Sequence, residues 1–134
     1  MDMKIHFPGN KKVHAEHNGF TIETDQPLAG GGDGTAPSPF DLFLASLGTC
    51  AGIYVLGFCQ QRGLPTEGIE LTQSMHFDHA SRMIGSIGID ISVPPTFPEK
   101  YREALANVAA LCAVKKHMET PPEFSITTSV REAV

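Results

Sequence analysis

The chain has 134 residues, of which 41% are hydrophobic and 19% are charged, and its formal net charge is −5. These values exclude a disordered chain and predict one globular domain, 1–134. The ten lysines and arginines are scattered, so we expect no nucleic-acid binding. No secretory signal is visible at the start, which favours a reducing, cytoplasmic location. A working cysteine in that compartment is expected to be catalytic or redox-active rather than a structural disulfide.

The first 25 residues alternate apolar and polar side chains, which predicts three short antiparallel strands. The Asn18-Gly19 pair between two of these runs is a strong hairpin signal. Residues 25–39 (DQPLAGGGDGTAPSP) are rich in Gly and Pro but lack the Lys-Ser/Thr ending of a phosphate-binding loop. We expect a mobile or turn-rich connection there.

Ser38 and Pro39 predict the start of a long helix, and Arg62-Gly63 predicts its end. Residues 42–59 lack charge and reach the length of a transmembrane helix. The strands on both sides need a core to cover their apolar faces, so we interpret the segment as a buried core helix and expect no membrane span. One set of strands cannot surround so long a helix, which suggests a second subunit.

The second half of the chain predicts a hairpin, a helix and a last strand. Alternation over 69–77 and 87–93, with the polar turn DHASR between them, predicts the hairpin. Pro98 opens a helix over 98–114, and residues 124–130 alternate again. The helix carries one apolar stripe, formed by Tyr101, Leu105, Val108 and Cys112. The order β-β-β-α-β-β-α-β defines an α+β domain of antiparallel sheet with two helices.

The three cysteines cannot all pair within one chain. Cys50 and Cys59 lie nine residues apart on one helix, about 13 Å along its axis, which is too far for a disulfide. We interpret Cys59 as a small buried hydrophobe. A pairing of Cys50 with Cys112 is geometrically possible. Potential metal ligands occur as isolated pairs without a second pair at zinc spacing, so we expect no metal. These pairs are Cys112 with His117 and His76 with His79.

Two segments resemble signatures of the OsmC/Ohr family (osmotically inducible protein C and organic hydroperoxide resistance). PSPFDLFLASLGTC, residues 37–50, resembles the signature of the first helix, and LCAVKKHMETPPEF, residues 111–124, resembles the second signature. Both stand in the family's order, and the resemblance covers nearly the whole chain. It implies an intertwined homodimer in which antiparallel sheets wrap around central helices, with active sites at the subunit interface. Such a dimer would bury the first helix on all sides.

The resemblance also implies an activity and a role for two cysteines. In the peroxidases of the family the first cysteine attacks the hydroperoxide and the second resolves the sulfenic acid as a disulfide. Carried over, Cys50 attacks and Cys112 resolves. The chain would then be an oxidoreductase of oxidative stress, a thiol-dependent peroxidase of organic hydroperoxides. A dithiol reductant would recycle it, and no cofactor is implied.

The sequence departs from the peroxidases at two positions. They use an Arg from an N-terminal strand and a Glu ten residues before the cysteine, whereas here the first Arg is Arg62 and that position is Phe40. Asp41, nine residues before Cys50, is half a turn away on an ideal helix. A dimer that binds a small apolar molecule at the subunit interface without peroxidase activity is therefore the alternative, and a purely structural dimer is also open. Cations that could activate Cys50 are His6, His14, His17, Lys115, Lys116 and His117.

Overall fold

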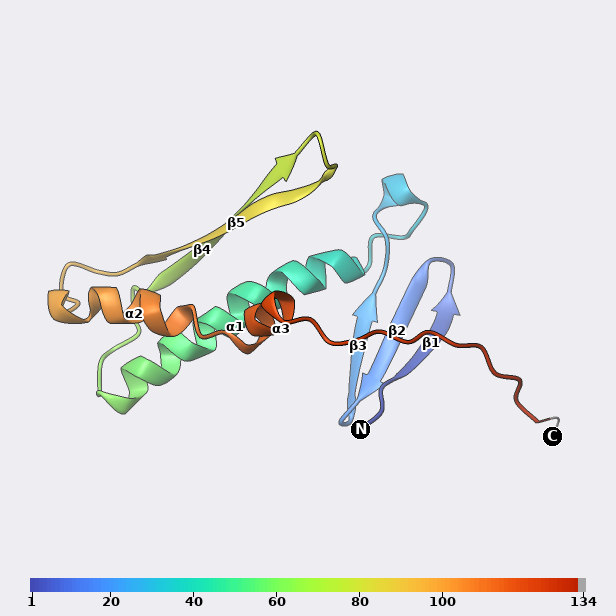
Figure 1. Ribbon diagram of the computed structural model, residues 1–134, viewed down its shortest axis with the longest axis horizontal. Helices are drawn as coiled ribbons and strands as arrows, with labels where there is room; N and C mark the ends of the chain where they lie inside the picture. The colour runs from blue at the N-terminus through green and yellow to red at the C-terminus, as the bar shows by residue number, and fades with distance from the viewer. Residues whose placement is uncertain (133–134) are drawn as a thin grey trace. The chain divides into compact units, whose positions relative to one another are not determined.

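The structure of the protein is a computed structural model that describes residues 1–132. Within these residues it contains two antiparallel sheets and three α-helices (Figure 1). The elements are β1 (Lys4–Gly9), β2 (Lys12–His17), β3 (Phe20–Thr24), α1 (Pro39–Gln61), β4 (Glu70–Asp78), β5 (Met83–Ser92), α2 (Arg102–Ala109) and α3 (Ala113–Glu119), with short 3-10 helices at Leu28–Gly30 and Glu99–Tyr101. The predicted α+β class and the order of elements up to the second helix are confirmed.

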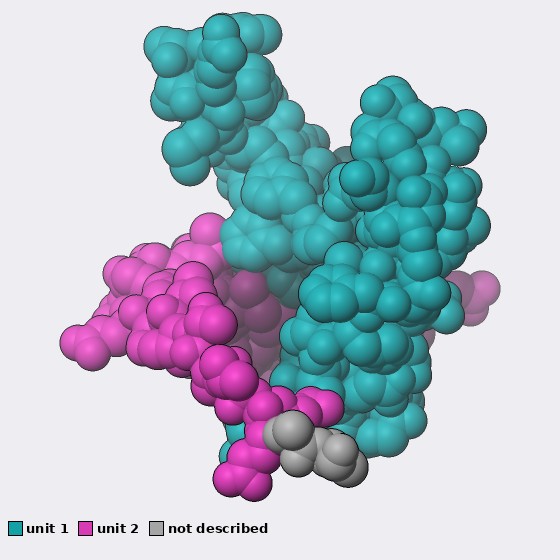
Figure 2. Space-filling model, turned by 90° about the vertical axis from the view of Figure 1, so that its right-hand side faces the viewer, with its two compact units in different colours: residues 1–49, 72–89 teal, residues 50–71, 90–134 magenta. Residues whose placement is uncertain are grey.

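The chain divides into two compact units, which Figure 2 distinguishes by colour. The first unit combines residues 1–49 with residues 72–89, and the second combines residues 50–71 with the chain from residue 90 onward. The boundaries fall inside α1 and inside the β4-β5 hairpin.

The three N-terminal strands form a sheet with two chemically different faces. Ile5, Ala15 and Ile22 are paired across β1, β2 and β3 and therefore share one face. His14 is paired with both His6 and Glu23, which places these three polar side chains on the other face. Residues 1–132 leave the apolar face largely open, since Ile5 is 56% exposed.

The connection from β3 to α1 is a closed, turn-rich loop. The buried carboxylate of Asp25 accepts hydrogen bonds from the backbone N–H of Gln26 (2.7 Å), from the backbone N–H of Thr35 (3.0 Å) and from the Thr35 hydroxyl (2.7 Å). The N–H of Asp25 donates to the carbonyl of Pro37 at 3.1 Å. These bonds hold the two ends of the loop together just before α1 begins.

Local capping sets both ends of α1, as predicted. The Ser38 hydroxyl accepts from the N–H of Asp41 at 3.2 Å, and Pro39 occupies the first helical position. At the other end Gly63 adopts a left-handed φ of 64°, and the N–H of Leu64 donates to the carbonyl of Cys59 at 2.9 Å.

One face of α1 packs into the protein and the opposite face does not. The buried side chains recur at helical spacing and are Leu47, Ala51, Val55, Phe58 and Cys59. Ile53 on the opposite face is 58% exposed, so the described part of the chain does not bury α1 on all sides. By length and composition α1 could cross a membrane, but the core helix of a soluble protein meets the same criterion.

The core of the second unit joins α1 to α2. Val55, Phe58 and Cys59 of α1 cluster with Phe97 and Leu105, and Leu105 of α2 is almost fully buried. Burying a side chain such as Leu105 contributes about 1.5–3 kcal/mol. This contact fixes α2 against the C-terminal half of α1 and thereby positions the segment that follows α2.

The predicted continuous helix over 98–114 is wrong. A 3-10 turn precedes α2, which ends at Ala109, and a new helix, α3, begins at Ala113. Cys112 separates the two helices with φ −46° and ψ 126°, a conformation outside the helical region. Its sulfur accepts the N–H of Lys115 at 3.5 Å and so caps α3. Cys112 therefore belongs to a helix cap and not to the stripe of one helix.

The predicted last strand over 124–130 is also absent from the described chain, because residues 121–132 adopt no regular structure. A strand needs a neighbouring edge with which to form hydrogen bonds. None of the described strands pairs with this segment, and Ile126 is 95% exposed.

Candidate active site

The structure brings together the two cysteines that the sequence singles out. Cys50 lies in α1 and is half-buried, whereas Cys112 lies at the N-cap of α3 and is only 3% exposed. Both residues belong to the second unit. The thiol of Cys112 donates a hydrogen bond to the sulfur of Cys50. Neither cysteine is in a disulfide.

The surroundings of Cys50 favour its thiolate. The hydrogen bond from Cys112 is the largest cause that lowers the pKa of Cys50, followed by the backbone N–H of Val114, with a smaller effect from that of Ala113. Burial acts in the opposite direction but does not overcome these donors. Three donors thus converge on one sulfur.

The pKa of Cys112 is shifted in the opposite direction. Burial, followed by the hydrogen bond that its thiol donates to Cys50, raises the pKa of Cys112, and the backbone N–H groups of Lys115 and Val114 only partly oppose this shift. Of the two thiols, Cys50 is therefore the one that loses its proton more readily. The arrangement favours ionisation of Cys50 beside a second thiol that can donate a proton.

The break between α2 and α3 creates this environment. The first N–H groups of a helix have no partner inside that helix. Because α3 begins directly after Cys112, the N–H groups of Ala113 and Val114 are available to Cys50. Sequence reasoning missed these two backbone donors, because it continued the previous helix through them and Cys is not a usual N-cap residue.

The six cations considered from the sequence do not set the pKa of Cys50 in the described chain, since its causes are the Cys112 thiol, two backbone donors and burial. The Lys115 ammonium lies 3.9 Å from the Glu119 carboxylate, and the ring of His117 donates to the carbonyl of Ala113 at 2.7 Å. The remaining candidates are His6, His14 and His17, which lie on β1 and β2, and Lys116, which lies on α3.

Phe40 and Asp41, the positions compared with the glutamate of the peroxidases, lie in the first turn of α1. They belong to the first unit, where the Phe40 ring packs against that of Phe43 with centroids 5.6 Å apart. Neither residue contributes to the pKa of Cys50. Among residues 1–132, no group of three or more His, Cys, Asp or Glu side chains is arranged to hold a metal ion.

Cys59 lies in the core cluster, is fully buried, and has its pKa raised chiefly by burial, with the charge of Arg62 opposing. A thiol in these surroundings is a poor nucleophile. Its packing agrees with the interpretation of Cys59 as a small hydrophobe.

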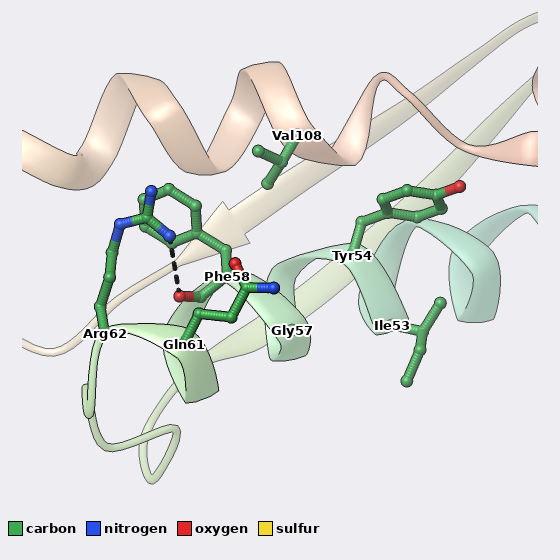
Figure 3. Close-up of a pocket in the computed structure, with 7 residues that line it drawn as sticks. All are labelled: Ile53, Tyr54, Gly57, Phe58, Gln61, Arg62 and Val108. Atoms are coloured by element: carbon green, nitrogen blue, oxygen red, sulfur yellow. Dashed lines mark hydrogen bonds between the residues drawn. The ribbon is translucent and has the colours of Figure 1, made fainter.

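A groove of about 480 Å³ begins one helical turn beyond Cys50 (Figure 3). We call it the Arg62 groove. It is lined by Ile53, Tyr54, Gly57, Phe58, Gln61 and Arg62 from α1 and its end, and by Val108 from α2. Its walls are mainly apolar, and among the described residues that line it Arg62 carries the charge. Sequence reasoning did not identify it, because Val108 comes from a distant part of the chain.

The antiparallel sheets, the long helix and the hydrogen-bonded thiols define a class of small α+β proteins with a dithiol site. The family described as OsmC-like protein matches residues 31–127, and the chain therefore belongs to this family. The resemblance noted from the two cysteine segments is thus confirmed. This membership supports a redox or stress-response protein.

Solved structures share the fold at low sequence identity. A protein from Psychrobacter arcticus 273-4, provisionally named for the osmotic stress and detoxification response, has 24% identity and a TM-score of 0.71 over 85% of each chain. The organic hydroperoxide resistance protein OsmC of Legionella pneumophila has 18% identity and a TM-score of 0.56 over 87% of each chain. OhrB of Bacillus subtilis, an organic hydroperoxide resistance protein, has 21% identity and a TM-score of 0.50 over 87% of this chain and 90% of its own. No curated protein matches the chain.

Proposed function

We propose that the protein is a thiol-dependent peroxidase that reduces organic hydroperoxides, with Cys50 as the attacking thiol and Cys112 as the resolving thiol. The observation that carries this proposal is the hydrogen bond from Cys112 to Cys50, which accompanies opposite shifts of the two pKa values. Membership of the OsmC-like family supports it. So do the names of the Legionella and Bacillus structures, which describe organic hydroperoxide resistance.

In the first step the Cys50 thiolate attacks the terminal oxygen of the hydroperoxide. A sulfur–oxygen bond forms, the O–O bond breaks, and the organic group leaves as an alkoxide. The alkoxide takes a proton, which the adjacent Cys112 thiol can supply, and becomes an alcohol. Cys50 is now a sulfenic acid.

In the second step the Cys112 thiolate attacks the sulfur of Cys50. A disulfide forms and hydroxide leaves, which becomes water after protonation. A dithiol reductant then returns both cysteines to thiols by exchange, and its own thiols become a disulfide. We propose a cytoplasmic location, since a reducing compartment supplies such a reductant.

The chain is proposed to act as a homodimer of single domains spanning residues 1–134. Within residues 1–132, apolar side chains are exposed on the Ile5 face of the N-terminal sheet, on the Ile53 face of α1 and in the segment around Ile126. Contiguous exposed apolar surface on a soluble protein marks an interaction site. A second copy of the chain would supply the cover for α1 and an edge for the 124–130 segment.

An alternative function is the binding of a small apolar molecule without peroxidase activity. The Arg62 groove favours this candidate, because its apolar walls suit a ligand. The alternative also agrees with the absence of any cation among the groups that lower the pKa of Cys50 in the described chain. A bound ligand together with no peroxide consumption would favour this second function.

The test is a count of free thiols after one equivalent of cumene hydroperoxide is added to the reduced protein. We expect Cys50 and Cys112 to disappear within minutes while Cys59 persists. Cys50→Ser should abolish consumption, and Cys112→Ser should permit one oxidation and then stall as a sulfenic acid. Cys59→Ser is the matched control. Survival of all three thiols, or full turnover by Cys50→Ser, would refute the proposal.

A further inference from the structure

The side chain of His117 contacts the peptide group that carries one of the two backbone donors to Cys50. His117 lies in α3, and its Nδ1 is 2.7 Å from the carbonyl oxygen of Ala113. A carbonyl oxygen only accepts hydrogen bonds, so Nδ1 carries a proton and donates it. This bond holds the ring of an otherwise exposed side chain against the first turn of α3.

The carbonyl of Ala113 and the N–H of Val114 belong to the same peptide group. Because that group is planar and trans, its C=O and its N–H point in opposite directions. Here the N–H donates to the Cys50 sulfur, while the C=O accepts from His117. The imidazole ring and the reactive sulfur are therefore connected through a single peptide group.

A hydrogen bond to this C=O strengthens the N–H of the same group as a donor. Hydrogen bonds that follow one another polarise each other, by about 10–30% per bond. The N–H of Val114 donates to a sulfur that becomes negatively charged, and bonds to charged groups are roughly twice as strong as neutral ones. The bond from His117 therefore stabilises the thiolate of Cys50 more than the thiol.

The same bond fixes the orientation of the peptide group. α3 spans only Ala113–Glu119, and so short a helix is marginal in isolation. Two side-chain hydrogen bonds hold its first turn: the sulfur of Cys112 accepts the N–H of Lys115 at 3.5 Å, and His117 donates to Ala113 at 2.7 Å. The ion pair of Lys115 with Glu119 is exposed and 3.9 Å long, so it adds little.

The position of His117 differs from that of its neighbour Lys116, although both side chains are exposed and line the same groove with Glu119 and Thr120. His117 is bonded to the backbone of the site, and its charge is not among the causes that lower the pKa of Cys50 in the described chain. Any influence of His117 on Cys50 therefore passes through the peptide group. A substitution of Lys116 changes the charge of the same surface and leaves this bond in place.

We infer that His117 is a positioning residue for Cys50, because its Nδ1–H holds and polarises the peptide group whose N–H stabilises the Cys50 thiolate. This role deepens the function proposed above and rests on it for the reaction that the thiolate performs. His117 takes no part in the cleavage of the O–O bond. It increases the fraction of Cys50 that is ionised at a given pH.

The first experiment needs no hydroperoxide. The rate at which iodoacetamide alkylates Cys50 is measured by peptide mapping over a pH series in the full-length, reduced protein. His117→Leu removes the donor, and the titration midpoint of Cys50 should rise by about 0.5 units, since part of a hydrogen bond to a charged group is lost. His117→Ala, a second variant without the donor, should give the same shift. Because His117 is exposed, neither change removes a core contact.

His117→Asn separates the hydrogen bond from a merely structural role. The side-chain amide of Asn is a donor at nearly the place of Nδ1, so it can bond to the same carbonyl. Asn is a poorer helix former than Leu or Ala. A role in helix stability alone would thus make His117→Asn the most damaging of the three changes. We expect instead that its midpoint lies close to that of the unmodified protein.

Lys116→Ala is the matched control and should leave the midpoint of Cys50 in place. An unchanged midpoint in His117→Leu, or equal shifts in His117→Leu and His117→Asn, would overturn the positioning role. An equal shift in Lys116→Ala would also overturn it, since the effect would then come from the charge of the surface.

Turnover of cumene hydroperoxide by the unmodified protein separates this role from the proposed function. Normal turnover together with an unchanged midpoint in His117→Leu would refute the positioning role alone. No turnover together with the expected midpoints of His117→Leu and His117→Asn would refute the peroxidase and support the positioning role. Where both hold, oxidation of Cys50 at a pH below its midpoint should be about threefold slower in His117→Leu and should recover in His117→Asn.

Discussion

The Cys112 thiol donates a hydrogen bond to the sulfur of Cys50 and is the largest cause that lowers the pKa of Cys50. Burial raises the pKa of Cys112, and the same hydrogen bond raises it further. The two thiols therefore differ in nucleophilicity because of their places in the fold. Cys50 is half-buried on α1, and Cys112 is enclosed at the start of α3.

This relationship predicts the order of alkylation. In reduced protein at neutral pH, iodoacetamide should modify Cys50 before Cys59, because burial raises the pKa of Cys59. The rate at Cys50 should follow a titration whose midpoint lies below the free-thiol value of about 8.5. Peptide mapping after brief alkylation, repeated over a pH series, measures both quantities.

Cys112→Ala removes the largest donor to Cys50, so the midpoint of that titration should move upward. Cys59→Ala is the matched control and should leave it in place. A reaction of Cys59 ahead of Cys50, or a midpoint unaffected by Cys112→Ala, would contradict the role of the hydrogen bond.

Gly32→Ala should destabilise the loop between β3 and α1. A Cβ atom on Gly32 would lie 2.0 Å from the carbonyl oxygen of Gln26, a backbone atom that cannot turn aside as a side chain can. We expect a loss of about 1–3 kcal/mol in the free energy of unfolding, measured by urea denaturation. Gly30→Ala in the same loop is the control, since its Cβ would make ordinary contacts at 3.6 Å with Pro27. Equal stabilities of the two variants would show that the loop backbone rearranges to accommodate the Cβ atom at position 32.

Local signals in the sequence were sufficient for the N-terminal strands and for α1. Asn18 and Gly19 adopt φ values of 49° and 79°, which is the left-handed pair that an Asn-Gly hairpin turn requires. Ser38 and Gly63 likewise act through bonds to residues a few positions away. These features depend on neighbours in the chain, so the sequence displays them directly.

The surroundings of Cys50 and Cys112 could not be predicted from the hydrophobic periodicity of the sequence. Helical spacing placed Cys112 on a stripe with Leu105 and Val108, yet the backbone turns at Cys112 and begins a new helix. That turn supplies the N–H groups of Ala113 and Val114 to Cys50. The alternation over 124–130 is a local pattern as well, but a strand forms only by pairing with a neighbour, and none of the described strands pairs with this segment.

The Asp25 carboxylate predicts a loss of stability in acid. Hydrogen bonds from the Thr35 side chain and backbone lower its pKa in the folded chain well below the unfolded value of about 3.9. As the pH falls below about 4, the unfolded chain therefore takes up a proton more readily than the folded chain, and stability decreases. The stabilisation is fully present above that range.

Urea denaturation at pH 7 and pH 3 tests this linkage. Asp25→Asn should be less stable than the unmodified protein at pH 7. Its free energy of unfolding should also decrease less between pH 7 and pH 3. Thr35→Val removes only the hydroxyl donor. Its loss of stability between pH 7 and pH 3 should lie between those of the unmodified protein and Asp25→Asn. A pH dependence that Asp25→Asn leaves unaltered would assign the acid sensitivity to other carboxylates.

The proposed homodimer predicts different effects on the two faces of the N-terminal sheet. Ile5→Lys places a charge on the uncovered apolar face, which a partner subunit would have to bury. Because burial of such a side chain contributes about 1.5–3 kcal/mol, the dimer dissociation constant should rise about ten- to a hundredfold. Thr21→Lys adds the same charge to the opposite, polar face, where Thr21 donates to Glu16 at 3.0 Å, and should leave the constant near its original value. Sedimentation velocity over a concentration series measures each dissociation constant. A monomeric unmodified protein, or equal constants for the two variants, would contradict the assignment of this face to the dimer interface.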